Sequence, residues 1–280
     1  MAVTWCLTLL MTACSGRVDV IKKSSDGVGA PGRSWRVLQF NLCDSGIASC
    51  YSGRSVRAAA TVIREWRPDV VTVNEVCRKD VSELGRALSA ADQGMVLTAA
   101  FEPAVNRRND GPFRCRNGQP YGIGVLAMPN TSGSGERRYD GRYPTQDLSD
   151  PEERVWLCIP ADGIYACTTH TASTSTAVAL AQCRYLTQTV VTTLRSRHGA
   201  VPVVVGADFN LPVGRSAGIQ PCLEHRYGSA GDEGRQDVVA SSGLTITSSA
   251  VIDMHGTTDH PALFVELARA RTKIHAAGTA

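Results

Sequence analysis

The pattern of apolar and polar positions predicts alternating strands and helices. Four short runs of β-branched and other apolar residues, each bounded by polar or turn-forming residues, are typical of buried strands. They cover residues 36–41, 69–75, 121–128 and 203–210. In the last run, V-V-V-G-A-D-F-N, we expect Gly206 to make a tight turn. If the backbone stays extended, Asp208 and Asn210 point to the same side.

Helical spacing follows the first two strands and recurs later in the chain. Ser55 is expected to cap a helix whose apolar positions are three or four residues apart. Those positions are Val56, Ala59, Ala60, Ile63 and Trp66. A second helix is expected at 81–88, and one long helix at 175–197.

Residues 154–170 predict a β-hairpin with a cysteine pair across it. Asp162-Gly163 is a strong signal for a two-residue turn. Counting outward from this turn places Cys158 directly opposite Cys167, at a non-hydrogen-bonded position where side chains lie closest. We therefore predict a disulfide between them.

The rest of the chain predicts more strands joined by polar loops. Strands are expected at 235–241 and 244–251, with a final one after the T-T-D-H-P loop. Segments 106–118 and 129–150 are expected to be surface loops. Since strands outnumber helices and no repeat or domain boundary is visible, the pattern favours one α/β domain of two packed sheets with helices outside.

Composition and the N-terminus both point to export. Ten cysteines without paired C-x-x-C spacings fit disulfides in an oxidising compartment, and a net charge of +3 does not by itself indicate nucleic-acid binding. Residues 2–13 are apolar but too short to span a membrane, and L-M-T-A-C-S-G resembles a bacterial lipobox that would lipidate Cys14. Because no Lys or Arg precedes this run, an earlier start or an ordinary cleaved signal stays an alternative.

These features divide the chain into four parts. We expect a signal peptide at 1–14, a flexible tether at 15–34, the folded domain at 35–268 and a tail at 269–280. The protein would be extracytoplasmic, either secreted or anchored to the cell membrane through a lipid on Cys14, and monomeric.

Eight cysteines remain once Cys6 and Cys14 are set aside, which is an even number. Besides the hairpin pair, a Cys43–Cys50 disulfide is expected because it would close a short loop directly after the first strand. The last two pairs follow by elimination: Cys77–Cys115 and Cys183–Cys222.

Polar residues end or follow several predicted strands. They are Asn41, Glu75, His170, Asp208, Asn210, Asp237, Asp259 and His260. Any one of them alone would more often be a solvated or turn residue, but the series favours a common site. Hard oxygen donors indicate Mg²⁺ or Mn²⁺ rather than zinc. Imidazoles and an amide can neutralise a phosphoryl group, and a carboxylate can orient or deprotonate water.

These motifs resemble, in order, those of the endonuclease/exonuclease/phosphatase superfamily, which has the DNase I-like fold. The matching segments are F-N, V-N-E, T-T-H, G-A-D-F-N, R-Q-D-V-V and T-D-H-P, and they run from about Trp35 to Leu267. The resemblance implies a four-layer α-β-β-α sandwich of two mixed sheets with the site at one edge. It also implies a divalent-metal-dependent phosphoesterase that uses water attack.

The resemblance assigns metal and water roles to one group of residues. Glu75 would hold the divalent metal, with Asn41 beside it. Asp208 would position the attacking water, and Asn210 would contact the scissile phosphate. Asp259 would be an additional carboxylate on the side of the metal or of the first histidine.

The resemblance places His170 and His260 on the phosphate oxygens, and Asp237 would orient His260 and fix its tautomer. Three departures from the family pattern bear on metal geometry and substrate class. Cys43 stands where some members carry Asp, Q-D-V replaces I-D-Y, and the His-supporting carboxylate that some nucleases place in mid-chain has no clear counterpart.

The substrate stays open at this point. A nuclease needs a basic surface, which the arginines of the two polar loops can supply, so nucleic acid is slightly favoured. They are Arg107, Arg108, Arg114, Arg116, Arg137, Arg138 and Arg142. The alternative is a phosphatase or phospholipase C-type enzyme acting on sugar or lipid phosphates. From another class, the alternative is a catalytically silent binding module on the same fold.

Overall fold

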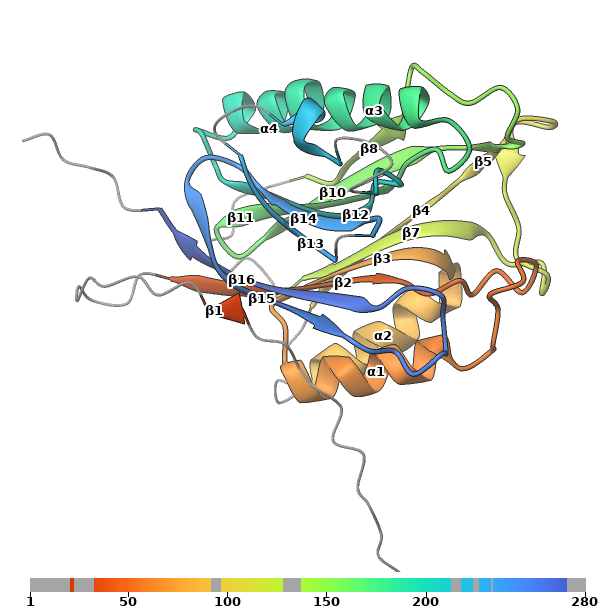
Figure 1. The fold of residues 1–280 in the computed structure, drawn as a ribbon, viewed down its shortest axis with the longest axis horizontal. Helices are drawn as coiled ribbons and strands as arrows, with labels where there is room; N and C mark the ends of the chain where they lie inside the picture. The colour runs from red at the N-terminus through yellow and green to blue at the C-terminus, as the bar shows by residue number, and fades with distance from the viewer. Residues whose placement is uncertain are drawn as a thin grey trace, which may run out of the picture.

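Two sheets pack face to face and carry helices on both outer faces, which gives four layers (Figure 1). The structure is a computed structural model that describes residues 21–22, 33–91, 97–127, 137–212, 218–223, 227–232 and 234–270. One sheet is covered by α1 (Ser55–Trp66) and α2 (Arg78–Ala91). The other is covered by α3 (Thr176–Arg184), the π-helical turn η1 (Tyr185–Val190) and α4 (Val191–Arg197). The four-layer sandwich expected from the sequence is confirmed.

In the described part of the chain, the first sheet has seven strands in the order β1-β15-β16-β2-β3-β7-β4. Their bounds are β1 (Ile21–Lys22), β2 (Ser34–Asn41), β3 (Val70–Cys77), β4 (Thr98–Pro103), β7 (Tyr121–Ala127), β15 (Leu244–Ile252) and β16 (Ala262–Arg269). β2 and β3 are parallel, and every other neighbouring pair in this sheet is antiparallel.

The second sheet has six described strands in the order β13-β14-β12-β11-β10-β8. Their bounds are β8 (Tyr139–Arg142), β10 (Val155–Ala161), β11 (Ile164–His170), β12 (Val203–Asp208), β13 (Gly228–Gly231) and β14 (Gln236–Ala240). Here β11 and β12 are the parallel pair. A small third sheet joins β5 (Val105–Asn106), β6 (Gly111–Pro112) and β9 (Glu152–Glu153), and a 3₁₀ turn, η2, covers Gln220–Cys222.

Among the described residues, the three largest apolar clusters hold the layers together, one between the sheets and one beneath each helical layer. Towards the site, the space between the sheets becomes polar. Gln39 Nε2 donates to Asn74 Oδ1 at 2.7 Å and to Gln236 Oε1 at 3.3 Å, and all three side chains are fully buried. Asn74 Oδ1 also accepts from the backbone N–H of Asp208 at 2.8 Å. This amide network fixes the end of β12 against the opposite sheet.

Gly206 is a strand residue, so the turn expected there is wrong. It lies inside β12, opposite Thr168 of β11 and Val238 of β14. A Cβ atom at this position would collide with Thr72 Oγ1 and lie 3.2 Å from Gln39 Oε1. Glycine is required because side chains of the opposite sheet approach its backbone.

Gly206→Ala is expected to lower the free energy of unfolding by about 1–3 kcal/mol, since Thr72 and Gln39 would have to move within a close-packed interior. Denaturant unfolding measures this change. Gly228→Ala on the edge strand β13 is the matched control, because a Cβ there meets no atom closer than 3.6 Å. Equal stability of the two variants would contradict the close approach at Gly206.

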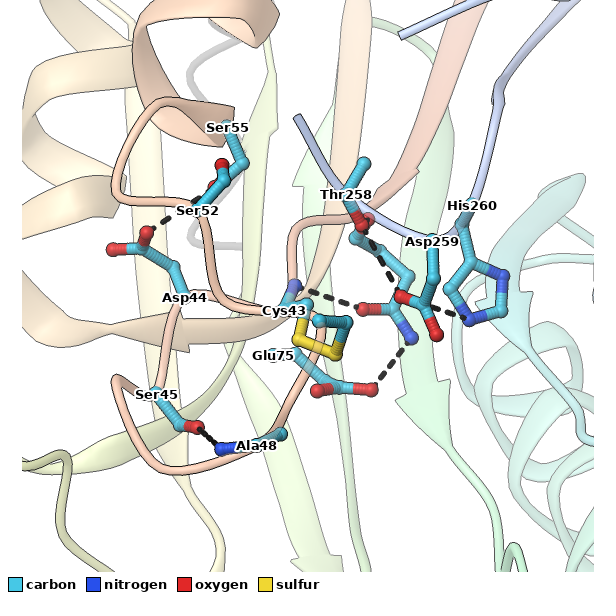
Figure 2. Close-up of a disulfide and its surroundings, with 12 residues drawn as sticks. Cys43, Asp44, Ser45, Ala48, Ser52, Ser55, Glu75, Thr258, Asp259 and His260 are labelled. Atoms are coloured by element: carbon cyan, nitrogen blue, oxygen red, sulfur yellow. Dashed lines mark hydrogen bonds and ion pairs between the residues drawn. A yellow bond between two sulfur atoms is a disulfide. The ribbon is translucent and has the colours of Figure 1, made fainter. Parts of the chain in front are cut away.

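The first helix begins differently from the sequence expectation. It starts at Ser55, after Arg54, so Ser55 is not the capping residue. The serine is buried, and its hydroxyl donates to Asp44 Oδ1 at 3.2 Å. The side chain therefore ties the helix to the loop that follows β2, shown in Figure 2, instead of capping backbone N–H groups.

Other differences are smaller. The helix expected at 175–197 is present as α3, η1 and α4, with a π-helical segment in its middle. The two expected loops contain the short strands β5, β6 and β8. β4 and β13 were not predicted, and the G-S-A-G sequence of β13 lacks the residues that favour strands.

All four predicted disulfides are present. They are Cys43–Cys50, Cys77–Cys115, Cys158–Cys167 and Cys183–Cys222. In the hairpin, Cys158 and Cys167 lie opposite each other as counted from the turn, with Cα atoms 4.0 Å apart.

The predictions for the signal peptide, for Cys14 and for most of the tail lie outside the described residues. Within the segment expected as a tether, β1 pairs with β15. None of the helices in the described ranges has the length and apolar character needed to cross a membrane.

Candidate active site

The parallel pairs bring four of the predicted site residues to one edge of the sandwich. β2 and β3 end near Asn41 and Glu75, and β11 and β12 end at His170 and Asp208. Asn41 Nδ2 donates to Glu75 Oε1 at 2.8 Å and to Asp208 Oδ2 at 2.9 Å. The amide thus bridges two carboxylates that come from opposite sheets.

Glu75 reaches the cleft because the strand is irregular at this point. Its φ is +56°, and the register of β3 against β7 shifts between Val73 and Val76. Burial raises the pKa of Glu75 to about 7, although the hydrogen bond from Asn41 opposes the rise. A divalent cation here would relieve the cost of burying the carboxylate.

Asn41 is turned with its NH₂ group toward the carboxylates, while its Oδ1 accepts from the backbone N–H of Cys43 at 3.2 Å. In this orientation Asn41 bridges Glu75 and Asp208 and does not present its oxygen to the cleft. Its role as a metal ligand stays a prediction.

The backbone turns sharply after Asp208. β12 ends at this residue, and Asn210 has a φ of +50°, so the extended geometry needed to point both side chains the same way is absent. Asp208 Oδ1 instead accepts from the backbone N–H of Asn210 at 2.9 Å, which forms an Asx turn. Asn210 Nδ2 donates to the Thr171 carbonyl at 3.0 Å. Both residues still line the same cleft.

The two histidines flank the buried Asp208 carboxylate. His260 Nε2 lies 3.5 Å from Asp208 Oδ2, and His170 Nε2 lies 3.8 Å from the same oxygen. His170 Nε2 is also 3.9 Å from Glu75 Oε1. The imidazoles therefore lie beside the two carboxylates, at distances longer than a hydrogen bond.

Arg154 is the site residue that sequence reasoning missed. It begins the hairpin just before β10, is 4% exposed, and its NH1 donates to His170 Nδ1 at 2.9 Å. Burial and the Arg154 cation hold the pKa of His170 well below its usual range. Nothing in the residue types around Arg154 in the sequence signals this contact, which depends on the pairing of β10 with β11.

Asp237 lies on β14, opposite Ala207 of β12. Within the described ranges it makes no hydrogen bond or ion pair with His260, so its predicted role in orienting that ring stays a prediction. Burial, together with the nearby Asp232 and Asp208 carboxylates, raises the pKa of Asp237 to about 8.

Asp259 sits at the entrance of the site, next to the Cys43–Cys50 disulfide (Figure 2). Its side chain is 50% exposed, and its Oδ1 lies 3.9 Å from His260 Nε2. Asp259 can therefore add negative charge near the cleft without being part of its buried floor.

The cleft has a volume of about 520 Å³. Its floor holds Glu75, Arg154, His170, Asp208, Asn210 and His260. Part of its rim is the loop closed by Cys43–Cys50, in which Ser45 Oγ accepts from the backbone N–H groups of Ile47 and Ala48. Figure 2 shows the contact with Ala48. The donor set facing the cleft is carboxylate, amide and imidazole, and the described cysteines are in disulfides. This set fits Mg²⁺ or Mn²⁺ and does not resemble a thiolate zinc site.

Comparison with known proteins finds the same fold. No protein-family model and no curated protein sequence matches the chain. An endonuclease/exonuclease/phosphatase protein from Beutenbergia cavernae is 18% identical, with a TM-score of 0.63 over 85% of this chain and 72% of its own. The human Nocturnin catalytic domain is 13% identical, with a TM-score of 0.56 over 90% and 98%. A mannosyl-6-phosphatase from Bacteroides thetaiotaomicron is 11% identical, with a TM-score of 0.56 over 83% and 99%. The chain therefore has the DNase I-like fold of the endonuclease/exonuclease/phosphatase proteins.

Proposed function

We propose that the protein is a divalent-metal-dependent phosphoesterase that hydrolyses a phosphate ester by attack of water. One observation carries the proposal. Side chains from opposite sheets meet in the cleft: both histidines lie within 4 Å of Asp208 Oδ2, and His170 also lies within 4 Å of Glu75 Oε1. Asn41 joins the two carboxylates by hydrogen bonds. A silent binding module would not need these groups to be buried together at that cost.

Each residue of the site has a separate role in the proposed hydrolysis. Asp208 Oδ2 orients the attacking water and accepts its proton. The Nε2 atoms of His170 and His260 face the oxygens of the phosphoryl group, and Asn210 lies beside it. Glu75 would hold Mg²⁺ or Mn²⁺, which when bound would neutralise charge on the phosphoryl group.

Nucleic acid stays the first substrate class to test, although the arginines support it less than their number suggests. Arg107 and Arg142 pair with Glu153, and Arg138 pairs with Glu102 and Asp140. Ion-paired arginines contribute less to phosphate binding than free ones. Sugar or lipid phosphates are the second class, because Ile47, an apolar residue that lines the cleft, is 57% exposed.

Plasmid nicking by the purified protein tests the proposal first. With Mg²⁺ we expect conversion of supercoiled to nicked DNA that EDTA abolishes, and Asp208→Ala, run in parallel, excludes a contaminating nuclease. If no nicking occurs, release of phosphate or headgroup from sugar phosphates, nucleotides and phospholipids is measured next. If the protein hydrolyses none of these substrates in a metal-dependent way, the result contradicts the proposal and favours the silent binding module.

The four disulfides support a further proposal, that the protein works outside the cytoplasm. Lipid attachment at Cys14 would then tether a monomeric domain to the membrane. Metabolic labelling with a radioactive fatty acid should mark the protein and leave Cys14→Ala unlabelled. An unlabelled wild-type protein would contradict lipid attachment at Cys14 and favour free secretion.

A further inference from the structure

The partner of His170 Nδ1 is a guanidinium group. Arg154 NH1 lies 2.9 Å from this nitrogen, and a guanidinium has only donors. His170 Nδ1 must therefore accept, and a neutral ring then carries its proton on Nε2. A carboxylate in the same place would instead accept from Nδ1 and favour a charged ring. The arginine therefore favours a neutral ring that donates from Nε2.

Arg154 is held rigidly. Its NH2 group pairs with Asp150 Oδ2 at 3.1 Å, and its NH1 group pairs with Glu152 Oε1 at 3.1 Å. Asp150 is itself fixed, because its Oδ1 accepts from the backbone N–H of Glu152 at 2.9 Å and its carbonyl accepts from Arg107 Nε at 3.2 Å. Two carboxylates balance the buried cation, so the guanidinium stays charged and in place.

The other ring nitrogen faces the cleft. His170 Nε2 is 3.8 Å from Asp208 Oδ2 and 3.9 Å from Glu75 Oε1, which is too far for a hydrogen bond to either carboxylate. A ligand oxygen bound in the cleft beside Nε2 would supply the acceptor that this N–H lacks among the described residues.

We propose that Arg154 is a positioning residue that fixes His170 as the Nε2–H tautomer, so that His170 acts on the phosphate as a neutral hydrogen-bond donor. The tautomer follows from the Arg154 contact alone. The action on phosphate rests on the proposed phosphoesterase function. In this protein His170 is thus supported by a guanidinium that Asp150 holds in turn.

Nitrogen NMR on the full chain labelled with ¹⁵N-histidine tests the tautomer without any substrate. A long-range ¹H–¹⁵N spectrum reports which ring nitrogen carries the proton, and His170→Gln identifies the His170 signals. We expect Nε2 protonated and Nδ1 bare in the wild type. Arg154→Met should lose this preference, whereas Arg154→Lys should keep it, because an ammonium group also only donates. A wild-type proton on Nδ1, or an unchanged tautomer in folded Arg154→Met, would overturn the proposal.

Kinetics test the link to turnover. Arg154→Met is expected to lower kcat by about 10–100-fold with a smaller change in KM, and Arg154→Lys should recover part of the loss. Arg36→Met is the matched control, since Arg36 is 41% exposed and pairs with Asp69 at the other end of β2. Equal kcat in Arg154→Met and Arg36→Met would overturn the positioning role. If the wild type turned over no phosphate ester, the phosphoesterase proposal would fail while the NMR result still decided the tautomer.

Discussion

Asp208→Asn is expected to abolish turnover while the protein stays folded. Asp208 Oδ2 is the atom that Asn41 contacts and that both histidines face. The amide has the same shape, and its oxygen can still accept from the backbone N–H of Asn210, so the Asx turn is preserved. It cannot accept a proton from water, and its NH₂ group would face the NH₂ group of Asn41. We expect a loss of about 10³-fold or more in kcat.

The measurement is the initial rate on whichever phosphate ester the wild type hydrolyses, with far-UV circular dichroism to confirm folding. Asp140→Asn is the matched control, because this carboxylate is exposed on β8 and pairs with Arg138 away from the cleft. Asp140→Asn should keep its rate. A folded Asp208→Asn variant with more than a tenth of wild-type activity would remove Asp208 from the proposed role.

Glu75→Gln is expected to make the metal-free protein more stable at pH 8 and to abolish its stabilisation by metal. Burial raises the pKa of Glu75 from 4.5 to about 7, so between these values the native state binds more protons than the unfolded state. The stability contributed by this group is therefore present below about pH 4.5 and is lost as pH rises through 7. Gln carries no charge to bury, so the variant avoids a cost on the order of 3 kcal/mol at pH 8.

Thermal unfolding in EDTA and in Mg²⁺ or Mn²⁺, at pH 5 and pH 8, checks both effects. In EDTA the Tm of Glu75→Gln should exceed that of the wild type at pH 8 and nearly equal it at pH 5. Metal should raise the wild-type Tm more at pH 8, where the carboxylate is charged, and leave the variant unchanged. The solvent-exposed Glu83→Gln serves as the control for losing one negative charge. A metal-induced rise in Tm that survives in Glu75→Gln would place the metal elsewhere.

The site residues that lie at the ends of strands were predictable from the sequence. Asn41, Glu75, His170 and Asp208 follow buried apolar runs, and parallel pairing brings such ends together. The hairpin disulfide was predictable because a two-residue turn sets the register of its strands.

Features that depend on contact between the sheets were not predictable. Gly206 looked like a turn because only the packing of Thr72 against it shows why a side chain is excluded. The sequence placed Arg154 at the start of the hairpin without a role, and its partners Asp150 and Glu152 lie beside it only in the folded protein. The left-handed backbone at Asn210 depends on the Asx turn made by Asp208.

The position of β16 has a consequence for the order in which the protein is made. This last strand lies inside the first sheet, between β15 and β2, and His260 comes just before it. β2, the strand that carries Asn41, therefore lacks β16 as a pairing partner until nearly the whole domain has been synthesised. A chain in which β16 has not yet left the ribosome, or one cut before residue 260, has an open sheet edge and an incomplete cleft. The proposed hydrolytic activity is thus expected to appear only after β16 has left the ribosome and paired with β2.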